Sequence, residues 1–335
     1  MSLFRTELRR LAKRRFARWM TVGGLLVLAV VVAGMFLSNQ KIGPDQWAEA
    51  ERAADQQHQQ QVYWAEQERA NCERAKAAGE RFYTTECDQI SPPLREDFQA
   101  EWFLPSTFVF RDSFGEMLIP LAAILAMIGF VVGASFVGAE WSTGGMMNLL
   151  LWRPKRLTVL LTKLGALLTG LLALALPATV AWFGSMWLVA DLRGSTERMT
   201  SGVWQSFLLT GLRGIVLALV AATVGFALAS LGRHTAMALG GAIGVLVVGQ
   251  VAIAMLLSMI QVRFLDAWLL PTYAYAWMTK QVELRDWRSC NASYTGECQP
   301  ATLEITWQHS SALFTVGIVL VLGGAIWAMR RRDIN

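Results

Sequence analysis

The residue types that most often do chemistry in proteins are sparse in this chain of 335 residues. Its histidines, His58, His234 and His309, lie far apart in sequence and form no pattern with the spacing of metal ligands. The sequence has no Gly-x-x-x-x-Gly-Lys-Ser/Thr phosphate loop, no Gly-x-Ser-x-Gly nucleophile elbow and no His-Glu-x-x-His zinc motif. We therefore expect no metal, no cofactor and no catalytic residue in this chain.

The cysteines are the second chemical signal, because they gather in two hydrophilic segments. They are Cys72 and Cys87 in residues 38–112, and Cys290 and Cys298 in residues 261–308. Four cysteines allow three disulfide connectivities, of which the local one pairs the two cysteines within each segment. Disulfides persist in oxidising compartments, so both segments are expected to lie outside the cytoplasm.

The elements that must position these residues are apolar helices. Hydrophobic residues make up 54% of the chain and charged residues 16%, whereas soluble domains average about 45–50% and about 25%. About 18 apolar residues suffice to cross a bilayer as a helix. The sequence predicts an all-α polytopic membrane protein with six spans, at residues 20–37, 117–137, 158–190, 212–231, 235–260 and 310–329.

Short basic segments that alternate along the chain with the cysteine-bearing segments predict the orientation. They occur in residues 1–19, in the loop 138–157, in the turn at Gly232 and in the tail 330–335. Lys and Arg are enriched in short cytoplasmic loops, so both termini are expected in the cytoplasm. The net charge of +5 thus indicates membrane topology and not nucleic-acid binding.

Residues 1–19 are expected to form a basic amphipathic helix that lies in the membrane surface. Apolar residues recur at helical spacing, while the polar positions include Arg9, Arg10 and Arg14. The segment is either an elbow helix that leads into the bundle or a positive flank that fixes orientation. A basic region before an apolar one also occurs in signal peptides, but the first apolar run is long and ends without a small-x-small site, so we expect a retained anchor.

The segment 38–112 differs in character from the rest of the chain. Gln, Glu, Ala and Arg dominate after Pro44 and Asp45, which predicts one long polar helix that Gly79 ends. It is therefore expected to be an extracytoplasmic helical module, serving as a lid, a partner-docking element or a stabilising insertion.

The cytoplasmic loop 138–157 has the most distinctive sequence, Gly-Ala-Glu-Trp-Ser-Thr-Gly-Gly-Met-Met-Asn-Leu-Leu-Leu-Trp-Arg-Pro-Lys-Arg-Leu. It resembles the permease subunits of bacterial ATP-binding-cassette transporters of the ABC-2 type. In that family a Glu, a Thr-Gly or Gly-Thr, several aliphatic residues and Pro-x-Arg mark this loop, and a Lys follows near the start of the next span. The matching residues here are Glu140, Thr143, Gly144, Pro154, Arg156 and Lys163. Leu270-Pro271-Thr272 and the ending Arg331-Arg332-Asp333 are also similar to the family.

The resemblance implies a permease subunit of the bacterial plasma membrane that exports an amphipathic substrate such as a lipid, a peptide or an antibiotic. Residues 140–151 would form a short helix that couples the spans to a separate ABC ATPase, which would bind ATP and magnesium. The elbow helix would touch the same ATPase. Alternatively, the loop is an ordinary interfacial turn in which Glu140 is solvated and the basic residues meet anionic membrane lipid.

The resemblance also implies a second copy of the permease or a homologue. The small residues Gly240-Gly241-Ala242-Ile243-Gly244 permit close helix packing, either at a homodimer seam or within one chain. Two other functions stay open from the residues: a receptor or scaffold that acts through segment 38–112, and a membrane-embedded enzyme. Lys163 and Arg213 are expected near span ends, where long side chains reach the interface.

Overall fold

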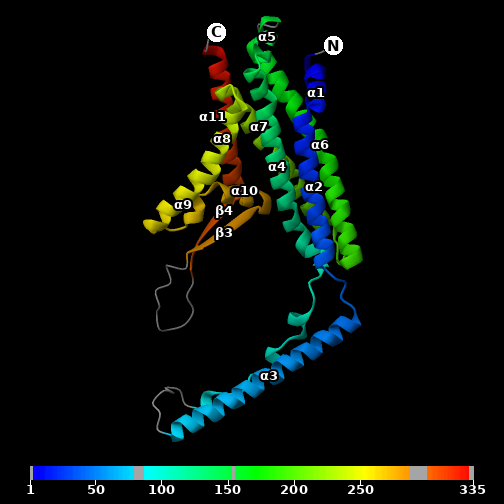
Figure 1. Cartoon of the computed structure of the whole chain (residues 1–335), viewed down its shortest axis with the longest axis vertical. Coiled ribbons are helices and arrows are strands. Elements are labelled where there is room, and N and C mark those ends of the chain that lie inside the picture. The colour runs from blue at the N-terminus through cyan, green and yellow to red at the C-terminus, as the bar shows by residue number, and fades with distance from the viewer. Residues whose placement is uncertain (1–2, 79–86, 153–154, 287–299, 332–335) are drawn as a thin grey trace. The chain divides into compact units, whose positions relative to one another are not determined.

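The computed structural model describes residues 3–78, 87–152, 155–286 and 300–331. Within them, six helical stretches are long and apolar enough to cross a membrane, which confirms the all-α polytopic class with six spans (Figure 1). They are α2 (Arg15–Ser38), α4 (Phe110–Ser142), α6 (Arg156–Arg193), α7 (Ser201–Gly232), α8 to α9 (Thr235–Met259) and α11 (Trp307–Arg331).

Several of these helices are longer than the apolar runs that predict them. Helix α7 begins at Ser201, well before the expected span at 212–231, and α4 begins at Phe110 instead of 117. Backbone hydrogen bonding continues a helix through its polar end turns, whereas hydropathy detects only the part that lies in hydrocarbon. Apolar composition therefore locates the spans but not their ends.

The N-terminal segment forms two helices where the sequence predicts one elbow over residues 1–19. Helix α1 covers Leu3–Lys13, and α2 begins at Arg15. Arg14 lies between them, where its own N–H donates to the carbonyl of Leu11 at 3.2 Å. The break separates the amphipathic part from the spanning part and lets the two helices take different directions.

The structure divides into two compact units that cut across α2, α4 and α6, and each is described separately. The first comprises Met1–Val31, Arg111–Met186 and Arg198–Asn335. Its core lies where α4 and α7 cross at glycines. An added Cβ at Gly133 would lie 2.4 Å from the carbonyl oxygen of Ala222, and one at Gly225 would lie 2.3 Å from that of Phe130. Absent side chains thus let the two backbones approach closely.

The segment 261–308, expected to be extracytoplasmic, contains more structure than a loop. Helix α10 (Leu270–Thr279) precedes an antiparallel hairpin of β3 (Gln281–Asp286) and β4 (Ala301–Thr306). The indole N–H of Trp277 donates to the carbonyl oxygen of Arg213 at 2.9 Å, and Met278 is buried. Helix α10 therefore packs on α7, partway along a spanning helix.

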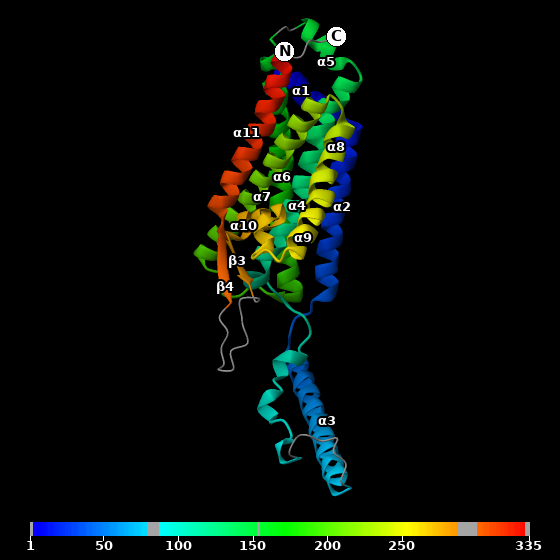
Figure 2. The ribbon, with the colours of Figure 1, turned by 90° about the vertical axis from the view of Figure 1, so that its left-hand side faces the viewer.

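The second unit comprises Val32–Phe110 and Trp187–Glu197. Its main element is α3 (Pro44–Ala77), one continuous polar helix in Figure 2, whose first turn is closed by a hydrogen bond from Gly43 N to Gln46 Oε1 at 2.8 Å. A disulfide joins Cys72 to Cys87. Short 3-10 turns follow at Cys87–Gln89, Arg95–Asp97 and Ala100–Phe103, and β1 (Phe108–Val109) pairs in parallel with β2 (Gly194–Ser195). Cys290 and Cys298 lie outside the described residues.

The fifth spanning stretch is exposed over most of its length, although Ala238 in its first half is buried. Helices α8 (Thr235–Ile243) and α9 (Gln250–Met259) are joined by a π-helical stretch, Gly244–Gly249, and no residue of the most apolar window is buried. An added Cβ at Gly240, Gly241 or Gly244 would meet no atom within 4 Å. These glycines therefore do not serve packing among the described parts of this one chain, and their role at a seam between copies stays a prediction.

The close approach of α4 and α7 at glycines predicts that a larger side chain there lowers thermal stability. Gly225→Val should push α7 away from Phe130, and overpacking of about 1–3 kcal/mol corresponds to a midpoint of thermal unfolding lower by roughly 3–10 °C. The matched control is Gly240→Val, which makes the same change where nothing is near. Thermal unfolding of both variants in detergent measures the difference. Equal midpoints would contradict the close approach of α4 and α7.

Candidate functional site

The basic segments meet at one end of the first unit. Arg156, at the start of α6, donates to the carbonyl oxygen of Met329, near the end of α11, at 3.2 Å. Gly138 of α4 lies against Thr235, and the guanidinium of Arg233 lies 5.1 Å from the centre of the Trp141 ring. Figure 1 shows α1, α5 and the C-terminal end of α11 gathered at this same end.

A buried ion cluster lies at the centre of this end. The ammonium nitrogen of Lys163, from α6, lies 2.6 Å from an oxygen of Glu7 in α1 and 2.6 Å from an oxygen of Glu140 in α4. The side chains of Lys163 and Glu7 are fully buried, and Glu140 is 15% exposed. Only the contact with Glu7 also has hydrogen-bond geometry, so Lys163 donates to Glu7 and forms a close ion pair with Glu140. Three helices far apart in sequence are joined at one cation.

Two arginines of the N-terminal segment complete the cluster. Arg10 lies 3.2 Å from Glu7, and the guanidinium of Arg14 donates to the backbone carbonyl oxygen of Ser135 at 2.6 Å. Burial lowers the pKa of Arg14 below its ordinary value, while the charges of Glu140 and Glu7 act in the opposite direction. Arg14 and Lys163 also lie 5.6 and 5.2 Å from the centre of the Phe136 ring. Because a charge in a low-dielectric interior is costly unless it is paired, these contacts fix the position of α1 against α4 and α6.

This arrangement differs from what the sequence led us to expect. Lys163 does not reach the interface from a span end, since its side chain is fully buried. The alternative in which Glu140 is solvated is not what the structure shows, because Glu140 lies in α4 and pairs with Lys163. Sequence reasoning missed Glu7, although a signal existed: it is the only acidic residue before Asp45 in a segment rich in arginine.

The predicted coupling segment forms a tight turn followed by a short helix. The hydroxyl of Thr143 donates to the carbonyl oxygen of Ala139 at 2.8 Å and closes the end of α4. Gly144 has φ of +71°, a conformation that side chains disfavour, and α5 (Gly145–Trp152) begins directly after it. Thr143 and Gly144 therefore set the direction of α5. Pro154 lies outside the described residues.

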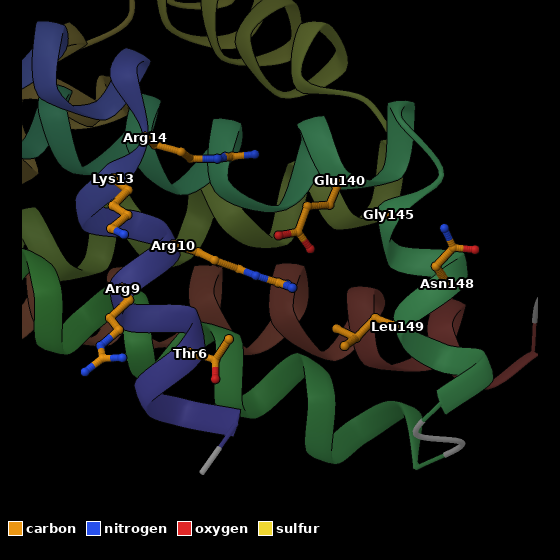
Figure 3. A pocket seen from close by; sticks show the side chains of 9 residues that line it. All are labelled: Thr6, Arg9, Arg10, Lys13, Arg14, Glu140, Gly145, Asn148 and Leu149. Carbon is orange, nitrogen blue, oxygen red and sulfur yellow. The ribbon is translucent and has the colours of Figure 1, made fainter. Parts of the chain in front are cut away.

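A cavity of about 820 Å³ separates α1 from α4 and α5. Its charged lining is strongly basic, with Glu140 as the single acidic residue. Figure 3 shows Arg10 reaching from α1 across this space toward Glu140 and Leu149. The cavity is lined by Thr6, Arg9, Arg10, Lys13, Arg14, Glu140, Gly145, Asn148 and Leu149. Of the predicted elbow residues, Arg9, Arg10 and Arg14 are thus brought together with the start of α5.

Two of the exposed residues of α5 are large and apolar, and Asn148 is exposed beside them. Leu151 is 80% exposed and Met147 39% exposed. This end of the unit therefore has a basic cavity beside a short helix whose apolar residues Met147 and Leu151 are exposed. In the parts of the chain that the structure describes, no group of three or more His, Cys, Asp or Glu residues could hold a metal ion.

The ion cluster makes a stability prediction. Lys163→Met should leave Glu140 without its cation and Glu7 with Arg10 alone, and destabilise the protein by about 3–5 kcal/mol. In a double-mutant cycle with Glu7→Gln, the coupling energy should be about 0.5–3 kcal/mol. The matched control is the exposed pair of Arg69 and Glu73 in α3, for which about 0–1 kcal/mol is expected. Unfolding in mixed detergent micelles measures each value, and a coupling energy as small as the control's would show that Lys163 and Glu7 do not interact as described.

The comparison with protein families agrees with this geometry. The family model described as "ABC-2 family transporter protein" matches residues 1–326. No curated protein and no solved structure matches the chain. The match includes α1, the ion cluster, α5, five spanning stretches and the sixth as far as residue 326. Because it covers nearly the whole sequence, the chain belongs to the ABC-2 family of transporter proteins and is the membrane-spanning permease component of an ABC transporter.

Proposed function

We propose that this permease exports an amphipathic substrate and is driven by a separate ABC ATPase that binds α5. The observation that carries the proposal is the buried cluster of Glu7, Glu140 and Lys163, which joins the elbow helix to two spans directly beside α5. A short helix with uncovered Leu151 and Met147 suits a groove on a cytoplasmic partner. ATP and magnesium would be bound by that partner.

The cluster supplies a mechanical path for the coupling. Helix α5 follows α4 after the single turn at Gly144, so a displacement of α5 acts on the last turn of α4, where Glu140 lies. Glu140 is held by Lys163 of α6, and Lys163 is held by Glu7 of α1. A movement imposed by ATP binding would therefore reach α1, α4 and α6 together and bias an inward-open against an outward-open bundle. In this proposal Glu140 positions the helices, and α5 makes the contact with the ATPase.

We further propose that two copies form the transport path, as a homodimer or with a homologue. Helices α8 and α9 support this, because no residue in the most apolar window of this span is buried within the described chain. Small residues at Gly240 and Gly241 leave open space into which another helix fits.

The location that suits this function is the bacterial plasma membrane, with both termini, α5 and the turn at Gly232 in the cytoplasm. The grouping of basic segments at one end of the first unit supports this orientation. The disulfide of Cys72 with Cys87 suits an oxidising outer compartment. The described spans are apolar and contain few charges, one of which is Arg213 beside the Trp307 ring. Such spans suit an amphipathic substrate better than an ion.

The role of α5 is tested by Leu151→Asp. A charge on this exposed leucine should abolish binding to the ATPase without unfolding the permease, because Leu151 has few internal contacts to lose. Leu94→Asp is the matched control, since Leu94 is also strongly exposed but lies in the second unit. Co-purification and ATPase turnover are measured for both. Normal assembly and turnover of Leu151→Asp would refute docking through α5.

The orientation is tested by labelling in intact cells. After mild reduction, Cys72 and Cys87 should react with a membrane-impermeant maleimide added from outside. A cysteine introduced by Ser142→Cys at the exposed C-terminal end of α4 should react only after the cells are permeabilised. The reverse pattern would overturn the proposed topology.

A further inference from the structure

The first unit contains a second cavity, which is apolar. It has a volume of about 460 Å³ and lies between α1 and α2 on one side and α4 and α6 on the other. Its walls are aliphatic apart from two glycines, Thr21 and Arg18, and Arg18 is the one charged residue among those that line it. Three of these helices include spanning segments, and the lining residues of α2, α4 and α6 belong to them, so the crevice lies along membrane-spanning parts of the chain. On α6 it extends from Leu167 to Leu174, which is about 10 Å along the helix axis.

The crevice exists because α1 ends where it does. Leu11, in the last turn of α1, packs onto Gly170 of α6, where even an added Cβ would lie 2.6 Å from the leucine side chain. This contact holds α1 against α6. The helix then breaks at Arg14 and the chain continues as α2, and the short side chains of Ala12, Ala17 and Ala173 are among those that border the space.

Arg18 is held at this break by the backbone. Its guanidinium donates to the carbonyl oxygen of Lys13, which the end of α1 leaves without a helical partner, at 3.0 Å. A hydrogen bond to a carbonyl does not neutralise the guanidinium. The exposed residues Lys13 and Arg15 add positive charge in the same short stretch. The only acidic residue before Asp45 is Glu7, which is fully buried with Lys163, so it does not compensate these cations.

An anionic lipid has an apolar acyl chain and a negatively charged headgroup. The apolar crevice suits the acyl chain, and the uncompensated cations at the start of the span suit the headgroup. We propose that the crevice binds one phospholipid with a negatively charged headgroup, whose acyl chain lies between α2 and α6 and whose phosphate lies beside Arg18. A zwitterionic lipid offers the same chain but no net charge, and each basic residue near the surface favours an anionic lipid by about 1 kcal/mol. The site goes beyond the proposed export function, since the lipid is a resident ligand and not the cargo.

The lipid would act on the same helix as the ion cluster. Glu7 holds α1 to α6 from one face, while Leu8, Leu11 and Ala12 border the crevice from another. An acyl chain in the crevice beside α1 would fill the space into which α1 could otherwise move. The composition of the inner leaflet would thereby influence how firmly the elbow helix is held.

The test uses the full-length permease in phosphatidylcholine nanodiscs that contain a small fraction of photoactivatable phosphatidylglycerol, with the reactive group on the acyl chain. Crosslinks mapped by mass spectrometry should fall in residues 8–22 and 167–174. Unlabelled phosphatidylglycerol should compete for them, and phosphatidylcholine should not. Arg18→Gln should lower the crosslinked fraction about five-fold, which is the affinity change for loss of about 1 kcal/mol.

Variants of the crevice walls separate a built site from general contact with lipid. Ala173→Trp should fill the space and remove the crosslinks, and Ala12→Leu provides a smaller filling change should the tryptophan variant fail to fold. Leu172→Trp is the matched control, because Leu172 is exposed, adjacent in sequence and outside the crevice. Arg52→Gln in α3 controls for loss of a positive charge.

Three results would overturn the proposal. Equal competition by phosphatidylcholine would show that the headgroup is not recognised, and full crosslinking of Ala173→Trp and Ala12→Leu would show that the crevice is not occupied. Efficient disulfide formation between two copies that carry Ala173→Cys would identify the occupant as a second copy of the chain. All of these outcomes are independent of the ATPase, so a failure here is distinct from a failure of the export proposal.

Discussion

The pairing of one buried ammonium group with two carboxylates constrains this protein more than any other described interaction. A fully buried Lys163 is tolerable only when negative charge lies within a few ångströms, and Glu7 and Glu140 supply it at 2.6 Å each. Because the three residues come from α1, α6 and α4, none of these helices is free to slide without separating a charge from its partner. The cost of that separation is what makes a salt bridge in a dry interior a mechanical link, whereas an exposed pair such as Arg69 with Glu73 adds little.

The two sides of the bundle use glycine for opposite purposes. Gly133 and Gly225 bring the backbones of α4 and α7 so close that a methyl group would collide with a carbonyl oxygen. In α8 the same residue type faces open space. Glycines in a spanning helix can therefore mark either close packing within the chain or an uncovered surface. Only the helices that surround them in the structure show which of the two applies. A transporter needs both, since some helix contacts must persist while others are made with a partner.

The sequence supports the fold class and the number of spans well, because hydropathy reports on burial in lipid without any knowledge of neighbours. It could not give the ion cluster, since residues 7, 140 and 163 are separated by long stretches and no local pattern links them. The apolar stripe of α1 was visible, but not that Glu7 on the same helix turns inward. Helix α10 was hidden for another reason: at 10 residues, Leu270–Thr279 is too short to register as a span, so a segment that packs on α7 resembled an outer loop. The pairing of Cys72 with Cys87 was one of the connectivities that spacing left open.

The π-helical stretch between α8 and α9 has a geometric consequence for whatever covers them. Each residue of an ordinary helix advances by about 100° around the axis, so inserting one extra residue into the hydrogen-bonding pattern rotates everything after it by roughly that angle. The side chains before Gly244 and those after Gly249 therefore point in different directions around the helix axis, although α8 and α9 form one continuous helical stretch. A straight neighbouring helix that lies flush with one half will diverge from the other, and a surface that contacts both halves must itself change direction near mid-length.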